Sequence, residues 1–136
     1  KSVRPLVWDK QVSFNGYSWR HQHELILFAE SDDAPPVPTG DGDILSHRAV
    51  AVDDRDHPAQ KPVPLLAQLI AKHETATVLD PFAGSGASLL AALQMKRKAI
   101  GIERDERYCE LLATRLSAGI PAQNDDGQGS LSAMFQ

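Results

Sequence analysis

The chain has 136 residues, a formal net charge of −4, 42% hydrophobic residues and one cysteine, Cys109. Its length fits one soluble globular domain, and the lone cysteine excludes an internal disulfide framework and a CxxC metal site. We expect no metal, no membrane partner, no signal peptide and a cytoplasmic location, with Cys109 as a small core residue. Because the net charge is negative, any contact with nucleic-acid phosphates must come from a local basic patch.

Apolar runs near the start predict two strands. Residues 3–9 (VRPLVWD) predict a buried strand, and residues 23–29 (HELILFA) predict a second one. An Asn-Gly pair lies between them and predicts a turn, so we expect an antiparallel hairpin with Tyr17 and Trp19 on one face. Packing within the hairpin is the preferred role for at least one of these rings. The alternative is a platform beside a flipped base or a cofactor ring.

Residues 31–56 change in character, because they are rich in proline, aspartate and glycine. This composition predicts a loop or linker in which only residues 44–45 and 49–52 pair briefly with another segment. Residues 57–64 (HPAQKPVP) then lead into a helix, since prolines are favourable in the first helical turn. Four apolar residues give this helix one buried stripe: Leu65, Leu66, Leu69 and Ile70. The loop before the helix offers a histidine, an amide and a lysine to a polar ligand.

Residues 77–90 (TVLDPFAGSGASLL) organise the rest of the chain. They predict a strand, a glycine-rich loop and the start of a helix, the arrangement in which open α/β sheets hold small ligands. Residues 99–103 predict a parallel strand that ends in Glu103, beside the loop. Basic residues 96–98 suit the C-terminal dipole of the first helix, and Asp105 should cap a further helix. From Ser117 onward the composition predicts a disordered tail.

The loop chemistry narrows the ligand. A dinucleotide site calls for a third glycine or alanine where Leu89 stands, and the chain has no Gly-Lys-Ser/Thr phosphate loop. Asp80 would repel a pyrophosphate but would attract an ammonium group. Glu103, about 20 residues beyond the glycines, suits ribose hydroxyls. A ligand with a ribose, an ammonium and a carboxylate but no phosphate is S-adenosylmethionine, whose carboxylate would meet the helix N-terminus.

These motifs resemble those of the DNA amino-methyltransferases, which methylate adenine N6 or cytosine N4. The resemblance lies in HPAQKP (57–62), DPFAGSGAS (80–88) and AIGIERDERYCE (99–110), in that order, which is similar to the permuted class with the catalytic half before the cofactor half. Residues 6–10 and 19–28 also resemble the strand and hairpin that follow the family's catalytic loop. The resemblance covers about residues 3–30 and 55–116.

The resemblance implies an α/β, Rossmann-like sheet and assigns the cofactor residues. Glu103 is expected to hold the ribose, Arg104 to lie beside the adenine, and Lys61 to border the methionine end. Residues 82–84 are expected to contact the cofactor mainly through their backbone. The full expected set is Lys61, Asp80, Phe82, Ala83, Gly84, Gly86, Glu103 and Arg104. Double-stranded DNA is the implied partner, and the candidate contacts to it are Arg20, Arg48 and Arg55.

The family's catalytic tetrapeptide, Asp/Asn/Ser-Pro-Pro-aromatic, does not occur in this chain. Residues 33–37 (DAPPV) have the wrong spacing and no aromatic residue, so we assign no catalytic residue. In the family, the strand with this loop lies between the strands that end at Asp80 and near Asp9. We therefore expect an incomplete sheet, with the rest supplied by an upstream segment or by another chain, including a second copy.

The expected organisation has four parts. Residues 1–30 form the strand and hairpin of the catalytic half, 31–56 a linker or short target-recognition loop, 57–116 the cofactor half and 117–136 the tail. The resemblance favours adenine N6 on family frequency, and the short loop favours a short or relaxed target sequence. Two other hypotheses stay open: a cofactor-binding fragment or subunit without activity of its own, and a methyltransferase of the same fold that acts on RNA or protein.

Overall fold

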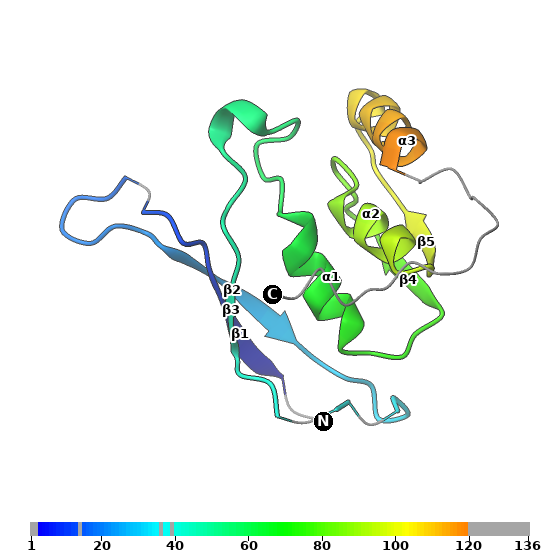
Figure 1. Ribbon diagram of the computed structural model, residues 1–136, viewed down its shortest axis with the longest axis horizontal. Helices are drawn as coiled ribbons and strands as arrows, with labels where there is room; N and C mark the ends of the chain where they lie inside the picture. Colours follow the sequence, from blue (N-terminus) through cyan, green and yellow to red (C-terminus); the bar gives the residue numbers. More distant parts are fainter. Residues whose placement is uncertain (1–2, 14, 36, 39, 120–136) are drawn as a thin grey trace, which may run out of the picture.

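A computed structural model describes residues 3–13, 15–35, 37–38 and 40–119 of the chain. Two small sheets lie on either side of a pair of helices (Figure 1). The elements in chain order are β1 (Arg4–Asp9), β2 (His23–Phe28), β3 (Ile44–Ser46), the 3-10 helix η1 (Val52–Asp54), α1 (Val63–Ala71), β4 (Thr77–Asp80), α2 (Ala87–Gln94), β5 (Lys98–Gly101) and α3 (Glu106–Gly119).

The first sheet has the order β2-β1-β3. β1 pairs antiparallel with β2, from Arg4 opposite Phe28 to Asp9 opposite His23, and parallel with the short β3. The two strands predicted for the hairpin are therefore confirmed, as is the brief pairing predicted for residues 44–45. Residues 49–52 form no strand, but the Ala49 amide donates to the Lys10 carbonyl at 3.0 Å, which is a brief pairing with the end of β1. The 3-10 helix η1 begins at Val52.

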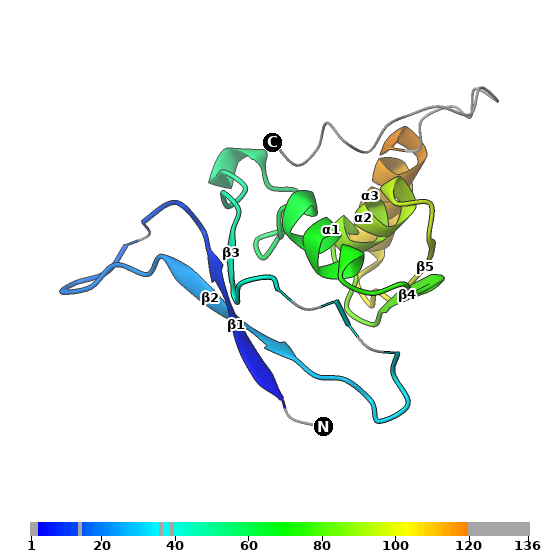
Figure 2. The same ribbon diagram turned by 60° about the horizontal axis from the view of Figure 1, so that its bottom comes forward.

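The expectation for the hairpin aromatics is wrong, because Tyr17 and Trp19 are exposed, with relative accessibilities of 109% and 89%. Pairing of the two strands ends with the Lys10 amide, which donates to the Gln22 carbonyl at 2.9 Å. Both aromatic residues lie beyond that bond, where no strand faces them. Figures 1 and 2 show this connection extending away from the rest of the chain.

The core joins α1 to the first sheet. Its centre is Trp8, Leu45 and Leu65, which are 3%, 6% and 1% exposed. The indole N–H of Trp8 donates to the His47 carbonyl at 2.7 Å, so the ring's one polar atom is satisfied inside the apolar cluster. Of the four residues in the apolar stripe predicted for α1, Leu65 and Leu69 pack in this cluster, while α1 also packs against α2.

β4, α2 and β5 form the second unit, a parallel strand pair joined by a helix, as predicted. α2 is buried from Ala87 to Ala92, because α1 packs on one side and the two strands lie on the other (Figure 2). Small residues allow this close packing: Ala87, Ala91 and Ala92 are at most 6% exposed. The unit sets the C-terminal ends of β4 and β5 side by side.

β1 and β4 belong to separate sheets, so the described residues form an α/β fold without one continuous sheet, in line with the expected incomplete sheet. The opposite face of the β4–β5 pair is open. Leu79 and Ile100 are register partners on that face and are 61% and 55% exposed. Among the described helices, none has the length and hydropathy needed to cross a membrane.

Three local expectations change. Cys109 is exposed rather than in the core, and the half-buried side chains near it on α3 are those of Tyr108, Leu111 and Leu112. α2 ends at Gln94, and the nearby Arg97 donates to the Ile70 carbonyl at 2.7 Å, so that side chain serves the end of α1 instead. α3 continues to Gly119, past the expected start of the tail, and residues 120–136 lie outside the described residues.

Candidate cofactor site

The loop from β4 to α2 depends on two glycines with left-handed backbone, Gly84 at φ 51° and Gly86 at φ 79°. Residues with a β-carbon rarely adopt these angles. The Ala83 amide donates to the Ile102 carbonyl at 2.9 Å, and the Gly86 amide donates to the Ala83 carbonyl at 2.8 Å. The loop is therefore fastened to the chain just beyond β5, which brings the two strand ends together.

Gly86 has a second role, because α3 packs directly on it. A β-carbon at this position would lie 2.9 Å from Cγ of Leu112. Such an approach is too close for two carbon atoms, so only glycine permits both the turn and the packing. Gly86 is also the residue that precedes α2, whose N-terminus faces the loop.

Asp80 shapes the loop from within. One carboxylate oxygen accepts the Phe82 amide at 2.9 Å, and the other accepts the Ser88 hydroxyl at the start of α2. A carboxylate has about four acceptor positions, so these two bonds leave room for an ammonium group. The Phe82 ring is 87% exposed beside the loop. The roles predicted for both residues in cofactor binding stay predictions.

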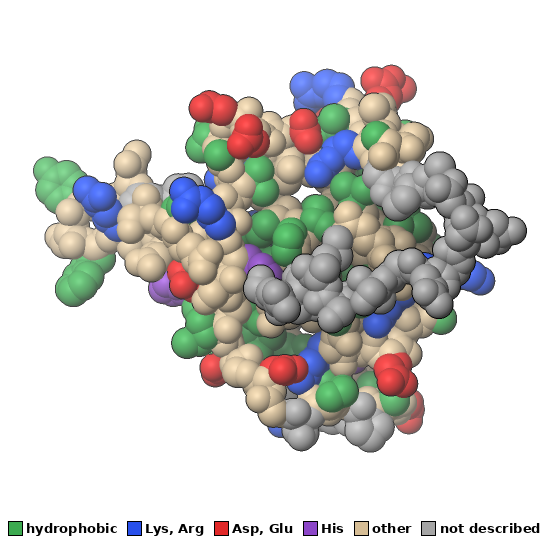
Figure 3. All heavy atoms as spheres, in the orientation of Figure 1, with side chains coloured by type: hydrophobic (Ala, Val, Ile, Leu, Met, Phe, Trp, Pro, Cys, Tyr) green, Lys and Arg blue, Asp and Glu red, His purple; other side chains and the backbone are tan. Residues whose placement is uncertain are grey.

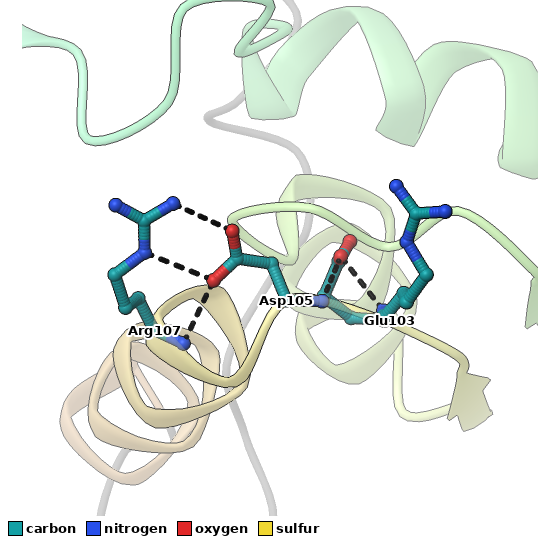
Figure 4. Close-up of polar contacts among 4 residues, drawn as sticks. Glu103, Asp105 and Arg107 are labelled. Carbon is teal, nitrogen blue, oxygen red and sulfur yellow. Dashed lines mark hydrogen bonds and ion pairs between the residues drawn. The ribbon is translucent and has the colours of Figure 1, made fainter.

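Glu103 connects the end of β5 to the glycine-rich loop. One carboxylate oxygen accepts the Gly84 amide at 2.8 Å, and the other accepts the amides of Arg104 and Asp105, also at 2.8 Å (Figure 4). These backbone bonds, that from Asp105 foremost, hold the pKa of Glu103 below its ordinary value. The carboxylate is therefore charged at neutral pH and fixed at the edge that the sequence predicted.

Asp105 caps α3, as predicted. Its Oδ1 accepts the Arg107 amide at 3.0 Å, and the Arg107 guanidinium binds both carboxylate oxygens (Figure 4). Hydrogen bonds from Arg107 lower the pKa of Asp105, and the same pairing raises the pKa of Arg107. The predicted adenine neighbour, Arg104, is exposed and donates its backbone amide to Glu103.

His57 and Arg115 also support the loop, and the sequence reasoning assigned neither of them a role there. The centroids of the His57 and Tyr108 rings are 4.3 Å apart. The His57 ring also lies beside Gly84, because a β-carbon placed on Gly84 would be 3.7 Å from it. Arg115 donates to the Ser85 carbonyl at 2.7 Å and pairs with Asp56 at 3.6 Å. The HPAQKP motif indicated that a histidine, His57, lies in the loop before α1. Nothing in the sequence indicated a role for Arg115.

Lys61 lies apart from the glycine-rich loop. Its ammonium pairs with Glu24 of β2 at 3.0 Å, and Lys10 pairs with the other oxygen of the same carboxylate. Burial raises the pKa of Glu24, but hydrogen bonds from the two lysines outweigh this and hold the pKa below its ordinary value. These side chains and Trp8 line a pocket of about 200 Å³, whose lining includes no loop residue. The expected contact of Lys61 with the cofactor stays a prediction.

The three candidate DNA contacts differ in setting. Arg20 and Arg48 are exposed. Arg55 is half-buried and donates to the carbonyls of Val50 and Pro58, at 2.9 and 3.2 Å, so it braces the segment before α1. Of the eight expected cofactor residues, the structure gathers all but Lys61 at one edge: Asp80, Phe82, Ala83, Gly84, Gly86, Glu103 and Arg104. Within the described residues, no cluster of three or more histidine, cysteine or carboxylate side chains could hold a metal.

Solved structures share this fold. A crystal structure of an M1.HpyAVI–SAM complex matches with a TM-score of 0.71 and 27% identity, over 84% of this chain and 62% of that chain. A protein of Escherichia coli (strain K12) named "Putative methylase YubD" is 39% identical over 114 residues, which are 82% of this chain and 48% of that protein. The Type II methyltransferase M.HindIII of Haemophilus influenzae is 43% identical over 84 residues, 60% of this chain and 26% of its own length.

The fold and the loop thus define a methyltransferase-like α/β unit. The family model for N6/N4 DNA methylases matches residues 3–114, and the chain belongs to this family. The chain spans about half of the length of YubD, about a quarter of that of M.HindIII, and less than two thirds of the solved M1.HpyAVI chain. The resemblance that the motifs suggested is confirmed.

Proposed function

We propose that this chain forms the S-adenosylmethionine-binding half of a DNA amino-methyltransferase. The observation that carries the proposal is the meeting of the Gly84 amide with the Glu103 carboxylate across adjacent parallel strand ends. Ligands of open α/β sheets bind at such edges. The solved M1.HpyAVI structure is a complex with SAM, which supports the same ligand here.

The side chains at this edge fit the ligand by charge and by acceptor count. Asp80 has acceptor positions left for an ammonium group, and the N-terminus of α2 favours a carboxylate. Glu103 already accepts three amides, so two ribose hydroxyls can bind only if one of these bonds is released. The Gly84 bond is the one that crosses the site. Phe82 and Arg104 complete the proposed set at this edge, and Lys61 is the proposed contact at the methionine end of the ligand.

S-adenosylmethionine, when bound, supplies the methyl group for transfer to an exocyclic amino nitrogen of a base. We assign adenine N6 as the favoured target and cytosine N4 as the alternative, in double-stranded DNA whose target base is flipped out of the stack. This chain's residues bind and orient the donor, while a Pro-Pro-aromatic loop outside this sequence contacts the base. Arg20, Arg48 and Arg55 are the proposed DNA contacts, and cytoplasmic restriction-modification is the proposed setting.

Methyl transfer from tritiated S-adenosylmethionine tests the proposal. The chain alone, and the chain together with a segment that contains a Pro-Pro-aromatic loop, would each be given duplex DNA, RNA and protein. We expect both preparations to bind the donor, and only the second to label DNA. Binding with no transfer in either would favour the alternative of a binding module without activity. Label in RNA or protein, or no binding of the donor, would contradict the proposal.

A further inference from the structure

The connection between β1 and β2 carries the most exposed aromatic rings of the described residues. Residues 11–13 and 15–22, here called the projecting loop, extend away from the body of the chain in both ribbon views. Tyr17 and Trp19 lie in this loop with almost their whole side chains in solvent. Tyrosine and tryptophan are the residue types that most often dominate binding interfaces, so their exposure here calls for a partner.

The shape of the loop is fixed by its backbone. A β-carbon at Gly16 would lie 2.2 Å from the Trp19 carbonyl oxygen and 2.9 Å from Cα of Arg20, so the chain folds back on itself too closely for any other residue. Two hydrogen bonds hold the base of the loop. The Gln11 amide donates to the Asp9 carboxylate at 3.0 Å, and the Lys10 amide donates to the Gln22 carbonyl at 2.9 Å. The aromatic rings are therefore presented by an anchored turn.

The charge of the projecting loop is opposite to that of the whole chain. Residues 11–22 contain Arg20 and no carboxylate, in a chain with net charge −4. Lys10, at the base of the loop, is paired with Glu24. Figure 3 shows Lys and Arg side chains beside hydrophobic ones on the projection. Arg20 is exposed next to Trp19. An exposed arginine beside aromatic rings, with no carboxylate among them, suits nucleic acid, since the cation can meet a phosphate and the rings can stack on bases.

We propose that the projecting loop is a DNA-contacting element: Tyr17 and Trp19 stack against bases at a locally unstacked site in duplex DNA, and Arg20 binds the adjacent phosphate. This inference rests on the proposed function, because it takes DNA as the substrate. Apolar and aromatic side chains that insert between neighbouring base pairs unstack them. The free-energy cost of unstacking is smaller for a mismatched or unpaired base than for a paired one. The loop would therefore hold DNA beside the base to be modified.

The two tryptophans provide a direct readout, because Trp8 is 3% exposed and Trp19 is 89% exposed. In the full chain, acrylamide quenches the exposed indole selectively. We expect added duplex DNA to quench the Trp19 emission and protect it from acrylamide, with tighter binding to a duplex that has one mismatch. Unchanged Trp19 emission at saturating DNA would overturn the proposal, and so would equal quenching by an RNA duplex or preference for a protein ligand.

Variants locate the contact. Trp19→Ala should weaken duplex binding by about 5- to 150-fold, the range for loss of one aromatic–base stack, and Trp19→Phe should retain most of the affinity. Arg20→Gln should lower the slope of log affinity against log salt by about 1. Leu27→Ala is the matched control, because Leu27 is a 73% exposed apolar residue on β2 outside the loop. We expect wild-type affinity for this variant.

Donor binding separates this inference from the proposed function. Each variant should bind S-adenosylmethionine as the wild type does, since the projecting loop lies far from the loop between β4 and α2 (Figures 1 and 2). Wild-type DNA affinity in Trp19→Ala, or an equal loss in Leu27→Ala, would overturn the projecting loop as the contact while the proposed function stands. If the wild type does not bind the donor, it is the proposed function that fails.

Discussion

Glu103 shows how one side chain can be both structural and functional. Its carboxylate accepts amides from the glycine-rich loop and from the turn before α3, so it holds two segments together without a ligand. The spacing of motifs predicted its place at the strand end, because parallel strands joined by a helix align their ends. The sequence could not predict the bond to Gly84, since that depends on a left-handed turn of the loop.

Gly86→Ala should lower the free energy of unfolding by about 2–4 kcal/mol, because the left-handed backbone and the overlap with Leu112 both oppose a β-carbon. Chemical denaturation measures this change. Gly40→Ala is the matched control, since Gly40 also has a positive φ, 106°, but nothing lies within 4 Å of its β-carbon position. If both variants lose equal stability, the packing of α3 on Gly86 is refuted.

At the scale of elements, α3 supports the site from outside the motifs. Arg115 bonds the Ser85 carbonyl, and the ring of Tyr108 packs beside that of His57. The helical periodicity of residues 105–116 predicted an inward face, and the structure confirms it. The polar contacts escaped prediction because their partners lie 30 residues or more away in the sequence, where no spacing rule applies.

Arg115→Met should destabilise the chain by about 1.5–3 kcal/mol, the value of a charge-assisted hydrogen bond to a carbonyl that is then left without its donor. Urea denaturation of the purified chain gives the difference. Arg107→Met is the control on the same helix, because the Arg107 side chain is 83% exposed and its surface pair with Asp105 should stabilise much less. An equal loss in the two variants would contradict the anchoring of the loop by Arg115.

Glu24 joins β2 to β1 and to the segment before α1 through its two lysines, and this predicts a pH dependence. Its pKa in the folded chain lies below the ordinary value of 4.5. The stabilisation is therefore complete above that value and is lost as the pH falls through the lower folded pKa. Each partly exposed pair contributes about 0.2–1 kcal/mol.

Glu24→Gln should flatten part of the fall in stability below pH 4.5, as measured by urea denaturation across a pH series. High salt serves as the control, because it screens partly exposed pairs and should reduce the difference between the wild type and the variant. If the free energy of unfolding of Glu24→Gln falls below pH 4.5 as steeply as that of the wild type at low salt, the lysine pairs do not stabilise the fold.

At the scale of the molecule, the chain is two α/β units joined by the packing of α1 on α2. Hydrophobic periodicity and the motifs were enough to predict the strands, the three helices and the break between the sheets. The exposure of Tyr17 and Trp19 could not be predicted from the sequence, because an Asn-Gly turn with aromatic residues beside it does not indicate where strand pairing ends. The open face of β4 and β5 likewise depends on which elements pack there.

That open face yields a paired test of orientation. Leu79→Lys should change the free energy of unfolding by no more than about 0.5 kcal/mol, because Leu79 is 61% exposed. Val78→Lys, one residue earlier and half-buried on the opposite face, should cost at least about 2 kcal/mol, since it places a charge against α2. The reverse order of the two effects would show that the described faces of the strand are wrong.

Calorimetric titration of the chain with S-adenosylmethionine tests the central claim most directly. We expect saturable binding at one site by the wild type, and weaker binding by about 1–3 kcal/mol in Glu103→Ala, the cost of unmatched hydrogen bonds to ribose hydroxyls. Glu106→Ala, three residues further along in the first turn of α3, is the control and should bind as the wild type does. No binding by the wild type, or equal affinity in Glu103→Ala, would contradict the account.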